Sequence, residues 1–539
     1  MKVIIETLLD VEELNNASST TVNEVEIKNE IDLNSGIISF PANACIRFSP
    51  SAKLKNGTVK LNDNYVYDAM QVMWENITFS DIEIDQRNGG SFTNDFIRPE
   101  WFYNSTDNTE GIQLAIDIAS RVGNVIQLAP KIYTIGTSLN IYSNTVINGT
   151  LNGAFDRNVW CGTTIRVEGS EIQESAIEFV CHRDECSSDK AYLKTCYKFR
   201  LSNFYLVNNS TVNNLVGLLF MSDYVPVSSD KSIAAPRNGS VECLRIYGFD
   251  KGIDIKDISY VEFNSIYISG FKSDGIRIRK KDPEKCSKTD FCIEFAWFNN
   301  IIIASPQNND NEGETSVVSG IHICDGNNIY FNNIRISDTT KGLYLESNQS
   351  LFAQFFNRMQ ILNCSDCIDI YASGSYITRM IFSEIILYGY QNGIFIHGAE
   401  RRILGDSSFS DIYDSAPHDN ANLINCNLTM SSLPFDRVRA INKIIFNDDI
   451  KRLDIINLKS KGTFRLPAGS TSVELNLGEY DLFNTQLDVY AKPLKSTYPE
   501  QIINGKTKYD STKKLFVCFN NMTSQSQDVE FEYYIPGLD

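Results

Sequence analysis

One four-residue unit recurs six times in this chain, as Gly252-Ile-Asp-Ile, Gly275-Ile-Arg-Ile, Gly320-Ile-His-Ile, Gly342-Leu-Tyr-Leu, Cys367-Ile-Asp-Ile and Gly393-Ile-Phe-Ile. The steps between successive tetrads are 23, 45, 22, 25 and 26 residues, so the longest step spans about two repeats. A fixed period of this length, made of short β-branched strands, is typical of a solenoid.

A second unit lies between the tetrads, where an apolar strand runs into Asn. It is seen at Phe263-Asn264, Phe298-Asn299, Phe331-Asn332 and Phe356-Asn357. Both units alternate apolar and variable residues, as β-strands do. About three short strands per coil then form a right-handed parallel β-helix, in which stacked coils bury a column of Ile and Phe. Asn is expected at one corner, with left-handed backbone and a ladder of side-chain amides, and Gly at another.

Size and charge set the broad class of the protein. At 539 residues one continuous solenoid core is possible, because solenoids grow lengthwise. The chain has 49 basic and 67 acidic residues and a net charge of −18, which argues against nucleic acid and anionic membranes as partners. An acidic polysaccharide in a local basic groove stays open. We expect neither a signal peptide nor a membrane span. The thirteen cysteines are expected to be mostly reduced.

The order of segments predicts four parts. Residues 1–30 are polar, without a period, and are interpreted as an attachment segment. Residues 31–97 form either the first coils or a small separate β domain. Residues 98–435 form the β-helix, with a cap helix at 107–122. Residues 441–539 alternate in another rhythm and predict an antiparallel β-sandwich, for trimerisation or glycan binding.

The cap helix has clear start and stop signals. Thr106 or Asp107 can cap its N-terminus, Gly123 ends it, and one face is apolar. That face holds Ile112, Ala115, Ile116 and Ala119. The Thr-x-x-Ile-Gln-x-Ala-Ile helix, the strands after it and the upstream Arg98-Pro-Glu-Trp-Phe resemble the N-terminal cap of the pectate-lyase-like β-helix superfamily, in a version common in gut Bacteroides and their phages. Many members of that superfamily are bacteriophage tail spikes and polysaccharide depolymerases.

Three columns of outward side chains are predicted on the coils, which lie about 4.8 Å apart. The tetrad column holds Asp254, Arg277, His322, Tyr344, Asp369 and Phe395. The column before the Asn corner holds Glu262, Glu294, Tyr330 and Gln354. The column after it holds Tyr267, Ile302, Arg335, Gln360 and Ile386. Together they are expected to form one shelf that suits a saccharide chain, with Tyr267, Tyr330, Arg335 and Tyr344 binding it.

Two chemistries fit such a shelf. Glu262 and Glu294 are the best carboxylate pair for glycoside hydrolysis, with Asp254 and Asp369 as further acids. The alternative is β-elimination from a uronic acid, with Arg277, His322 and Tyr344 in one column. Both compete with the interpretation of these acids as an ordinary solvated face.

No metal or other cofactor is expected. Cys364 and Cys367 have ligand spacing, but Cys367 replaces a corner Gly, which favours a buried structural thiol. Cys181, Cys186 and Cys196, with His182, could hold zinc or form a disulfide. An acidic loop near Asp310 lacks the full calcium pattern.

The resemblance and the patterns favour a phage tail spike in the virion tail. It would be a homotrimer that recognises, and in one version depolymerises, a host surface polysaccharide, with the N-terminus docking to other tail proteins. Ile302, Ile386 and Phe395 are outward apolar residues and predict the trimer interface. The alternatives are a bacterial carbohydrate-active enzyme, either hydrolase or lyase, and a structural virion protein without a ligand.

Overall fold

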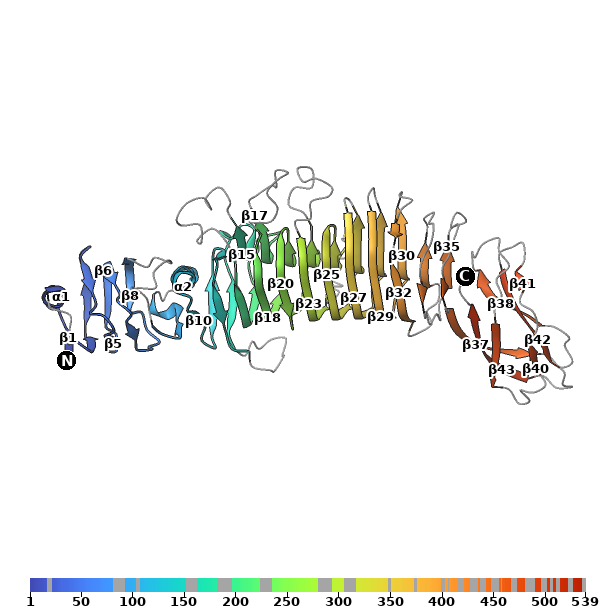
Figure 1. The fold of residues 1–539 in the computed structure, drawn as a ribbon, viewed down its shortest axis with the longest axis horizontal. Helices are drawn as coiled ribbons and strands as arrows, with labels where there is room; N and C mark the ends of the chain where they lie inside the picture. The colour runs from blue at the N-terminus through green and yellow to red at the C-terminus, as the bar shows by residue number, and fades with distance from the viewer. Residues whose placement is uncertain are drawn as a thin grey trace. The chain divides into compact units, whose positions relative to one another are not determined.

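The computed structural model divides the chain into two compact units, of which the first ends at Asp250 and the second begins at Lys251. Both are built almost wholly from β-strands (Figure 1). No helix among the described residues combines the length and apolar character that crossing a bilayer requires. The structure describes residues 1–16, 22–80, 93–102, 107–151, 162–181, 196–222, 235–279, 293–304, 317–347, 350–372, 376–398, 403–405, 407–414, 421–426 and, after these, the backbone of separate strands.

The first unit begins with coils. A parallel sheet joins β1 (Lys2–Ile5), β2 (Glu24–Ile27), β5 (Cys45–Phe48) and β7 (Tyr65–Val66). A second parallel set joins β3 (Glu30–Asp32), β4 (Ile37–Ser39), β6 (Lys53–Lys60) and β8 (Trp74–Ser80). Helix α1 (Leu8–Asn16) follows β1. The segment 1–30, which was expected to have no period, contains β1 and β2, and these strands stack on successive coils with Lys2 opposite Glu24. Between residues 31 and 97 the described pairings are parallel, as the first-coil alternative predicts.

The cap follows, with β9 (Phe96–Ile97), a 3-10 turn (Pro99–Trp101) and α2 (Thr109–Val122). The predicted apolar face of α2 is buried, and Gly123 ends the helix in the left-handed conformation at φ 78°. Its N-cap is Asn108, whose side chain makes no cap bond. Instead the Asp107 carboxylate accepts hydrogen bonds from the backbone nitrogen and hydroxyl of Thr109 at 2.8 and 2.6 Å.

Parallel coils complete the first unit. Their strands are β10 (Val125–Gln127), β11 (Ile132–Ile135), β12 (Leu139–Ile141), β13 (Val146–Asn148), β14 (Thr164–Val167), β15 (Ser175–Cys181), β16 (Arg200–Asn208), β17 (Val216–Ser222) and β18 (Arg237–Tyr247).

The second unit is a parallel β-helix, with the tetrads in one sheet and longer strands in the other. The tetrad sheet holds β19 (Lys251–Ile255), β22 (Asp274–Ile278), β24 (Ser319–Ile323), β26 (Lys341–Ser347), β28 (Asp366–Ala372), β30 (Asn392–Gly398), β33 (Asn422–Cys426) and β35 (Lys443–Phe446). The long-strand sheet holds β20 (Ile258–Asn264), β21 (Tyr267–Ser269), β23 (Ile293–Ala304), β25 (Gly326–Ser337), β27 (Ser350–Leu362), β29 (Tyr376–Tyr388), β31 (Ile403–Gly405), β32 (Ser408–Asp414), β34 (Phe435–Asp436) and β36 (Ile455–Ile456).

The core of the second unit is a column of stacked rings between these sheets. The rings are those of Phe263, Phe298, Phe331, Phe356, Phe382 and Phe409, with successive centroids 4.4 to 5.1 Å apart. The Ile and Leu residues of the tetrads are buried beside them. This confirms the predicted apolar column, which repeats because each coil places the same residue above its predecessor.

The corners differ in detail from the prediction. At the Asn corner it is the next residue that takes the left-handed conformation, with φ 55° at Ser265 and 57° at Asn300. Side-chain amides do form bonds between coils, as from Asn333 to Asn300 at 2.7 Å. At the tetrad corner, a Cβ on Gly342 would lie 2.3 Å from a side-chain carbon of Ile361, so close packing requires Gly there.

The C-terminal strands pair antiparallel in two sheets. One holds β37 (Leu458–Leu466), β39 (Tyr490–Lys495) and β43 (Gln527–Ile535), and the other β38 (Val473–Glu479), β40 (Ile502–Asn504), β41 (Lys508–Tyr509) and β42 (Lys514–Asn521). Two antiparallel sheets agree with the predicted β-sandwich. Parallel pairing lasts through β35 and β36, so the β-helix extends past the predicted boundaries at 435 and 441.

Candidate functional site

The tetrad column has the predicted register. Asp254 pairs with Arg277, then His322, Tyr344, Asp369 and Phe395 follow on successive strands. We call the outward side chains of β19, β22, β24, β26, β28 and β30, together with the residues that directly follow β22 and β24, the tetrad face. Because the strands are in register, neighbouring residues of the column lie about one strand spacing, ~4.8 Å, apart.

The predicted column before the Asn corner is wrong in register. Glu262 pairs with Trp297, which pairs with Tyr330. Glu294 instead pairs with Ser259 and Asn327. The reason is a left-handed residue, Phe295 at φ 53°, which shifts the alternation by one residue after Glu294. The carboxylates of Glu262 and Glu294 are therefore not stacked as the predicted hydrolytic pair.

The column after the Asn corner has the predicted register, with Tyr267, Ile302, Arg335, Gln360 and Ile386 on successive strands. It belongs to the long-strand sheet, beyond a bend, whereas the tetrad column belongs to the other sheet. The three columns thus do not form one shelf. Phe395 lies on the tetrad face, apart from Ile302 and Ile386, so these three residues do not make one apolar stripe as predicted.

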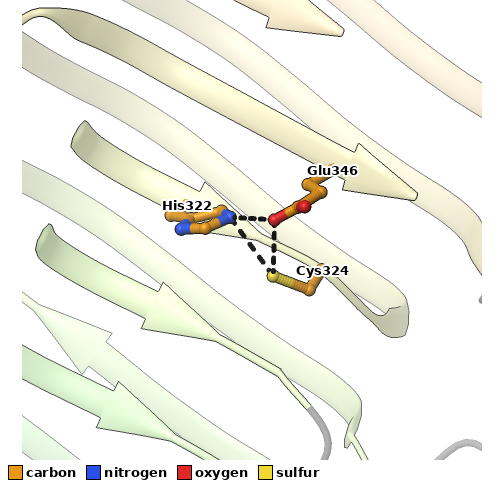
Figure 2. A group of neighbouring side chains, drawn as sticks. All are labelled: His322, Cys324 and Glu346. Carbon is orange, nitrogen blue, oxygen red and sulfur yellow. Dashed lines mark hydrogen bonds and ion pairs between the residues drawn. The ribbon is translucent and has the colours of Figure 1, made fainter. Parts of the chain in front are cut away.

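His322 is the centre of the first polar cluster on the tetrad face (Figure 2). Its Nδ1 lies 3.3 Å from the Asp274 carboxylate, and its Nε2 lies 3.0 Å from Glu346 and 3.2 Å from the Cys324 sulfur. Burial lowers the pKa of His322, but the hydrogen bonds to Asp274, Cys324 and Glu346 outweigh it and raise the pKa to about 11. Without another cation, the imidazole is therefore protonated at neutral pH.

Two arginines border this cluster. Arg277 forms an ion pair with the other oxygen of Asp274 at 3.5 Å, and Arg279 pairs with Asp254 at 3.3 Å. The Asp254 side chain is only 2% exposed. Its second oxygen, Oδ1, has no hydrogen-bond partner among the described residues. Buried polar atoms usually have a hydrogen-bond partner, so this oxygen has capacity to accept a further donor.

Asp369 is the centre of the second polar cluster. Its two oxygens lie 2.8 Å from the Lys341 ammonium and 2.8 Å from His397 Nε2, and its side chain is 2% exposed. The His397 ring stacks on Phe395 with centroids 4.2 Å apart. Lys341 also lies 3.4 Å from the centre of the Tyr344 ring. Charge and aromatic surface therefore alternate along the face.

Asp366 stands beside this cluster on the same strand. It accepts a hydrogen bond from the Asn392 amide at 2.8 Å. Burial raises the pKa of the Asp366 carboxyl, and the nearby charge of Asp369 raises it further, against the lowering effect of Asn392. Asp366 and Asp369 are thus two acids of one strand in unlike surroundings, since Asp369 is bonded to Lys341 and His397, and unlike surroundings separate the roles of an acid and a base.

The predicted elimination trio is brought together, but not as bases. Arg277 is paired with Asp274, and His322 carries a proton. Burial, with Glu346 and Asp369 nearby, raises the pKa of Tyr344, so its phenol stays neutral. The geometry therefore disfavours Arg277, His322 and Tyr344 as the proton-abstracting groups of a lyase.

Several residues of the tetrad face were missed from the sequence. They are Asp274, Cys324, Lys341, Glu346, Asp366 and His397. Cys324 is half-buried and its sulfur lies 3.2 Å from His322 Nε2. The spacing of His322 and Cys324, two residues apart on a strand, was a usable signal, because such residues share a face.

Among the predicted cysteine sites, Cys364 and Cys367 are both buried and free, as structural thiols would be. Cys196 is also buried. Cys186, His182 and Asp310 lie outside the described residues.

Comparison with known proteins gives distant structural likenesses. No family model matches the chain, and no curated protein matches it. The solved structures that it resembles include a tailspike protein of Acinetobacter baumannii bacteriophage Fri1, a capsular polysaccharide depolymerase, with 12% identity, coverage of 87% of this chain and 92% of that one, and a TM-score of 0.37. They also include the tailspike of E. coli bacteriophage HK620 in complex with a pentasaccharide, with 10% identity, coverage of 98% and 89%, and a TM-score of 0.40. Because these identities and TM-scores are low, the fold assignment depends on the strand pairings of this chain itself.

Proposed function

We propose that this chain is a tailspike-type β-helix protein that binds a surface polysaccharide along the tetrad face. The observation that carries the proposal is the continuous row of paired charges and aromatic rings across β19 to β30. Six strands at the usual spacing make a surface about 24 Å long, which suits an extended oligosaccharide. Aromatic rings such as Phe395 can stack on sugar faces. Arg277 and Arg279, whose side chains are 26% and 36% exposed, can donate hydrogen bonds to sugar oxygens.

Burial distinguishes this face from an ordinary solvated surface. Asp254 and Asp369 are 2% and 1% exposed as residues, although both stand on the outside of the sheet. Removing carboxylates from water is unfavourable unless partners compensate. The partners are Arg279 for Asp254, and Lys341 with His397 for Asp369. Buried ion pairs hold these side chains in fixed positions. A binding surface requires fixed positions, whereas a solvent-exposed structural surface does not.

Hydrolysis of the bound glycan is the second part of the proposal. Asp366, with its raised pKa, would protonate the leaving oxygen. Asp369, bonded to Lys341 and His397, would act as base or nucleophile. In this proposal Asp366 and Asp369 take the roles that the sequence suggested for Glu262 and Glu294. Hydrolysis is favoured over elimination because Arg277, His322 and Tyr344 offer no free base.

A panel of bacterial capsular polysaccharides tests the proposal. The wild-type protein is incubated with each glycan, while binding, new reducing ends and the ultraviolet absorbance of unsaturated uronic acids are followed together. We expect binding to at least one glycan, with reducing ends that appear without the absorbance and are lost in Asp366→Asn. Absorbance with the reducing ends would overturn hydrolysis. Full binding by Asp369→Asn would overturn the assigned face.

A homotrimer in a virion tail, docked through its N-terminal coils, completes the proposal. Ile302 and Tyr413 are each 42% exposed, and they stand in one column of the long-strand sheet with Arg335, Gln360 and Ile386 between them. Exposed apolar side chains, here with Ile386 next to Tyr413, are expected at an interface. Light scattering with size-exclusion chromatography should give three times the chain mass of 60.8 kDa. A monomer at micromolar concentration would contradict the trimer.

A further inference from the structure

Three side chains on the tetrad face converge on one point (Figure 2). His322 and Cys324 come from β24 and the residue after it, and Glu346 comes from the neighbouring strand β26. The distances are 3.2 Å from sulfur to Nε2, 3.0 Å from Nε2 to the Glu346 carboxylate and 3.8 Å from sulfur to that carboxylate. The His322 nitrogen, the Cys324 sulfur and the Glu346 carboxylate oxygen therefore all lie close to one another.

Hydrogen bonds alone cannot join all three of these atoms well. A ring nitrogen carries at most one proton, yet Nε2 faces both a carboxylate oxygen and a sulfur at contact distance. A proton there can point well at only one of them. A metal ion placed between the three atoms would bond to all of them at once.

We propose that His322, Cys324 and Glu346 bind one divalent transition-metal ion of the zinc type. Zinc bonds of about 2.3 Å to sulfur, 2.0–2.1 Å to imidazole and 2.0–2.2 Å to carboxylate, at tetrahedral angles, place ligand atoms about 3.3 to 3.6 Å apart. The three observed distances bracket that range. A mixed set of sulfur, nitrogen and oxygen suits zinc or cobalt and does not suit calcium or magnesium, which prefer oxygen.

Asp274 supplies the outer support that such sites have. Its carboxylate lies 3.3 Å from His322 Nδ1 and accepts that proton, which leaves Nε2 free to bind the metal. The other Asp274 oxygen is held by Arg277 at 3.5 Å. A carboxylate that orients a metal-binding histidine in this way typically changes metal affinity 10–100-fold when it is removed.

Three protein ligands leave a fourth position open, as in catalytic rather than structural zinc sites. The Glu346 side chain is 24% exposed, so the open position is reached from the tetrad face. A water molecule, or a hydroxyl or carboxylate of a ligand on that face, would occupy it. Metal binding itself does not depend on the proposed glycan function, and the two can fail separately.

Cobalt titration of the full-length protein tests the site, because cobalt reports a thiolate ligand by a charge-transfer band. We expect one equivalent of Co²⁺ to bind with that band, and Zn²⁺ to displace it. Cys324→Ala and Cys324→Ser should both lose the band, with circular dichroism confirming that they fold. Cys45→Ala, at a half-buried free thiol in the first unit, is the matched control and should keep it.

Two further variants sharpen the assignment. His322→Gln should weaken Co²⁺ binding at least about 100-fold, and Asp274→Asn about 10–100-fold. No charge-transfer band with excess Co²⁺, or a band that persists in Cys324→Ala, would overturn the proposal. Unchanged affinity in Asp274→Asn would overturn the supporting role of Asp274.

Discussion

The inner phenylalanine column and the outer tetrad face are made by the same repeat, but they do different things. Inside, Phe263 to Phe409 stack ring on ring, and each coil offers its neighbour the same surface. Outside, each coil offers a different side chain, and the contacts are between unlike groups such as Asp369 and Lys341. The uniform column stabilises the coil stack, whereas the varied face sets the chemistry.

Phe331→Ala should have the largest effect on stability. The ring is buried between Phe298 and Phe356, and its loss leaves a cavity that costs about 3–5 kcal/mol. Denaturant unfolding measures it. The adjacent outward residue gives the control, since Tyr330→Ala should cost less than half as much. Equal losses would show that the inner and outer columns do not differ as described.

Asp369→Ala should rank second, at about 2–4 kcal/mol, because it leaves the Lys341 ammonium and His397 without their shared acceptor. Asp369→Asn keeps the shape and should cost less in unfolding while still losing glycan binding. The same unfolding assay, paired with a binding assay, separates the two effects. A glycan affinity that follows stability through both variants would make Asp369 structural only.

Gly342→Ala should cost about 1–3 kcal/mol, since the added carbon meets the Ile361 side chain and the Cys367 carbonyl and forces overpacking. Cys367 occupies the same corner one coil later, so that coil has room for a side chain where the coil of Gly342 has none. Cys367→Ala is the comparison and should leave the midpoint of denaturant unfolding closer to that of the wild type. A larger loss in Cys367→Ala would reverse this ordering.

Arg358→Ala should have the smallest effect, below about 0.5 kcal/mol. Its ion pair with Glu384 is at an exposed corner, where both side chains are at least half exposed, and solvated pairs contribute little. Thermal unfolding at low and high salt checks this. A loss as large as that of Asp369→Ala would mean that exposed and buried ion pairs are equivalent here.

The sequence predicted the tetrad register because Gly and two Ile or Leu residues mark each coil. It failed for Glu294, because the left-handed residue Phe295 shifts the alternation and nothing in a Phe marks a bend. Glu346 and His397 lie beyond the four-residue motif, so their places became clear only once the strands were extended. Ion pairs such as Lys341 with Asp369 depend on which coils are neighbours and on side-chain direction, which a repeat alone does not specify.

The most direct test of the account is to measure the dissociation constant of a polysaccharide fragment for four variants and to compare each value with that of the wild-type protein. Asp254→Asn and Asp369→Asn change the tetrad face, whereas Glu262→Gln and Tyr330→Leu change the long-strand sheet. We expect at least about tenfold weaker binding, ~1.4 kcal/mol, for the first two, and changes within about twofold for the others. Weakened binding confined to Glu262→Gln and Tyr330→Leu would contradict the account.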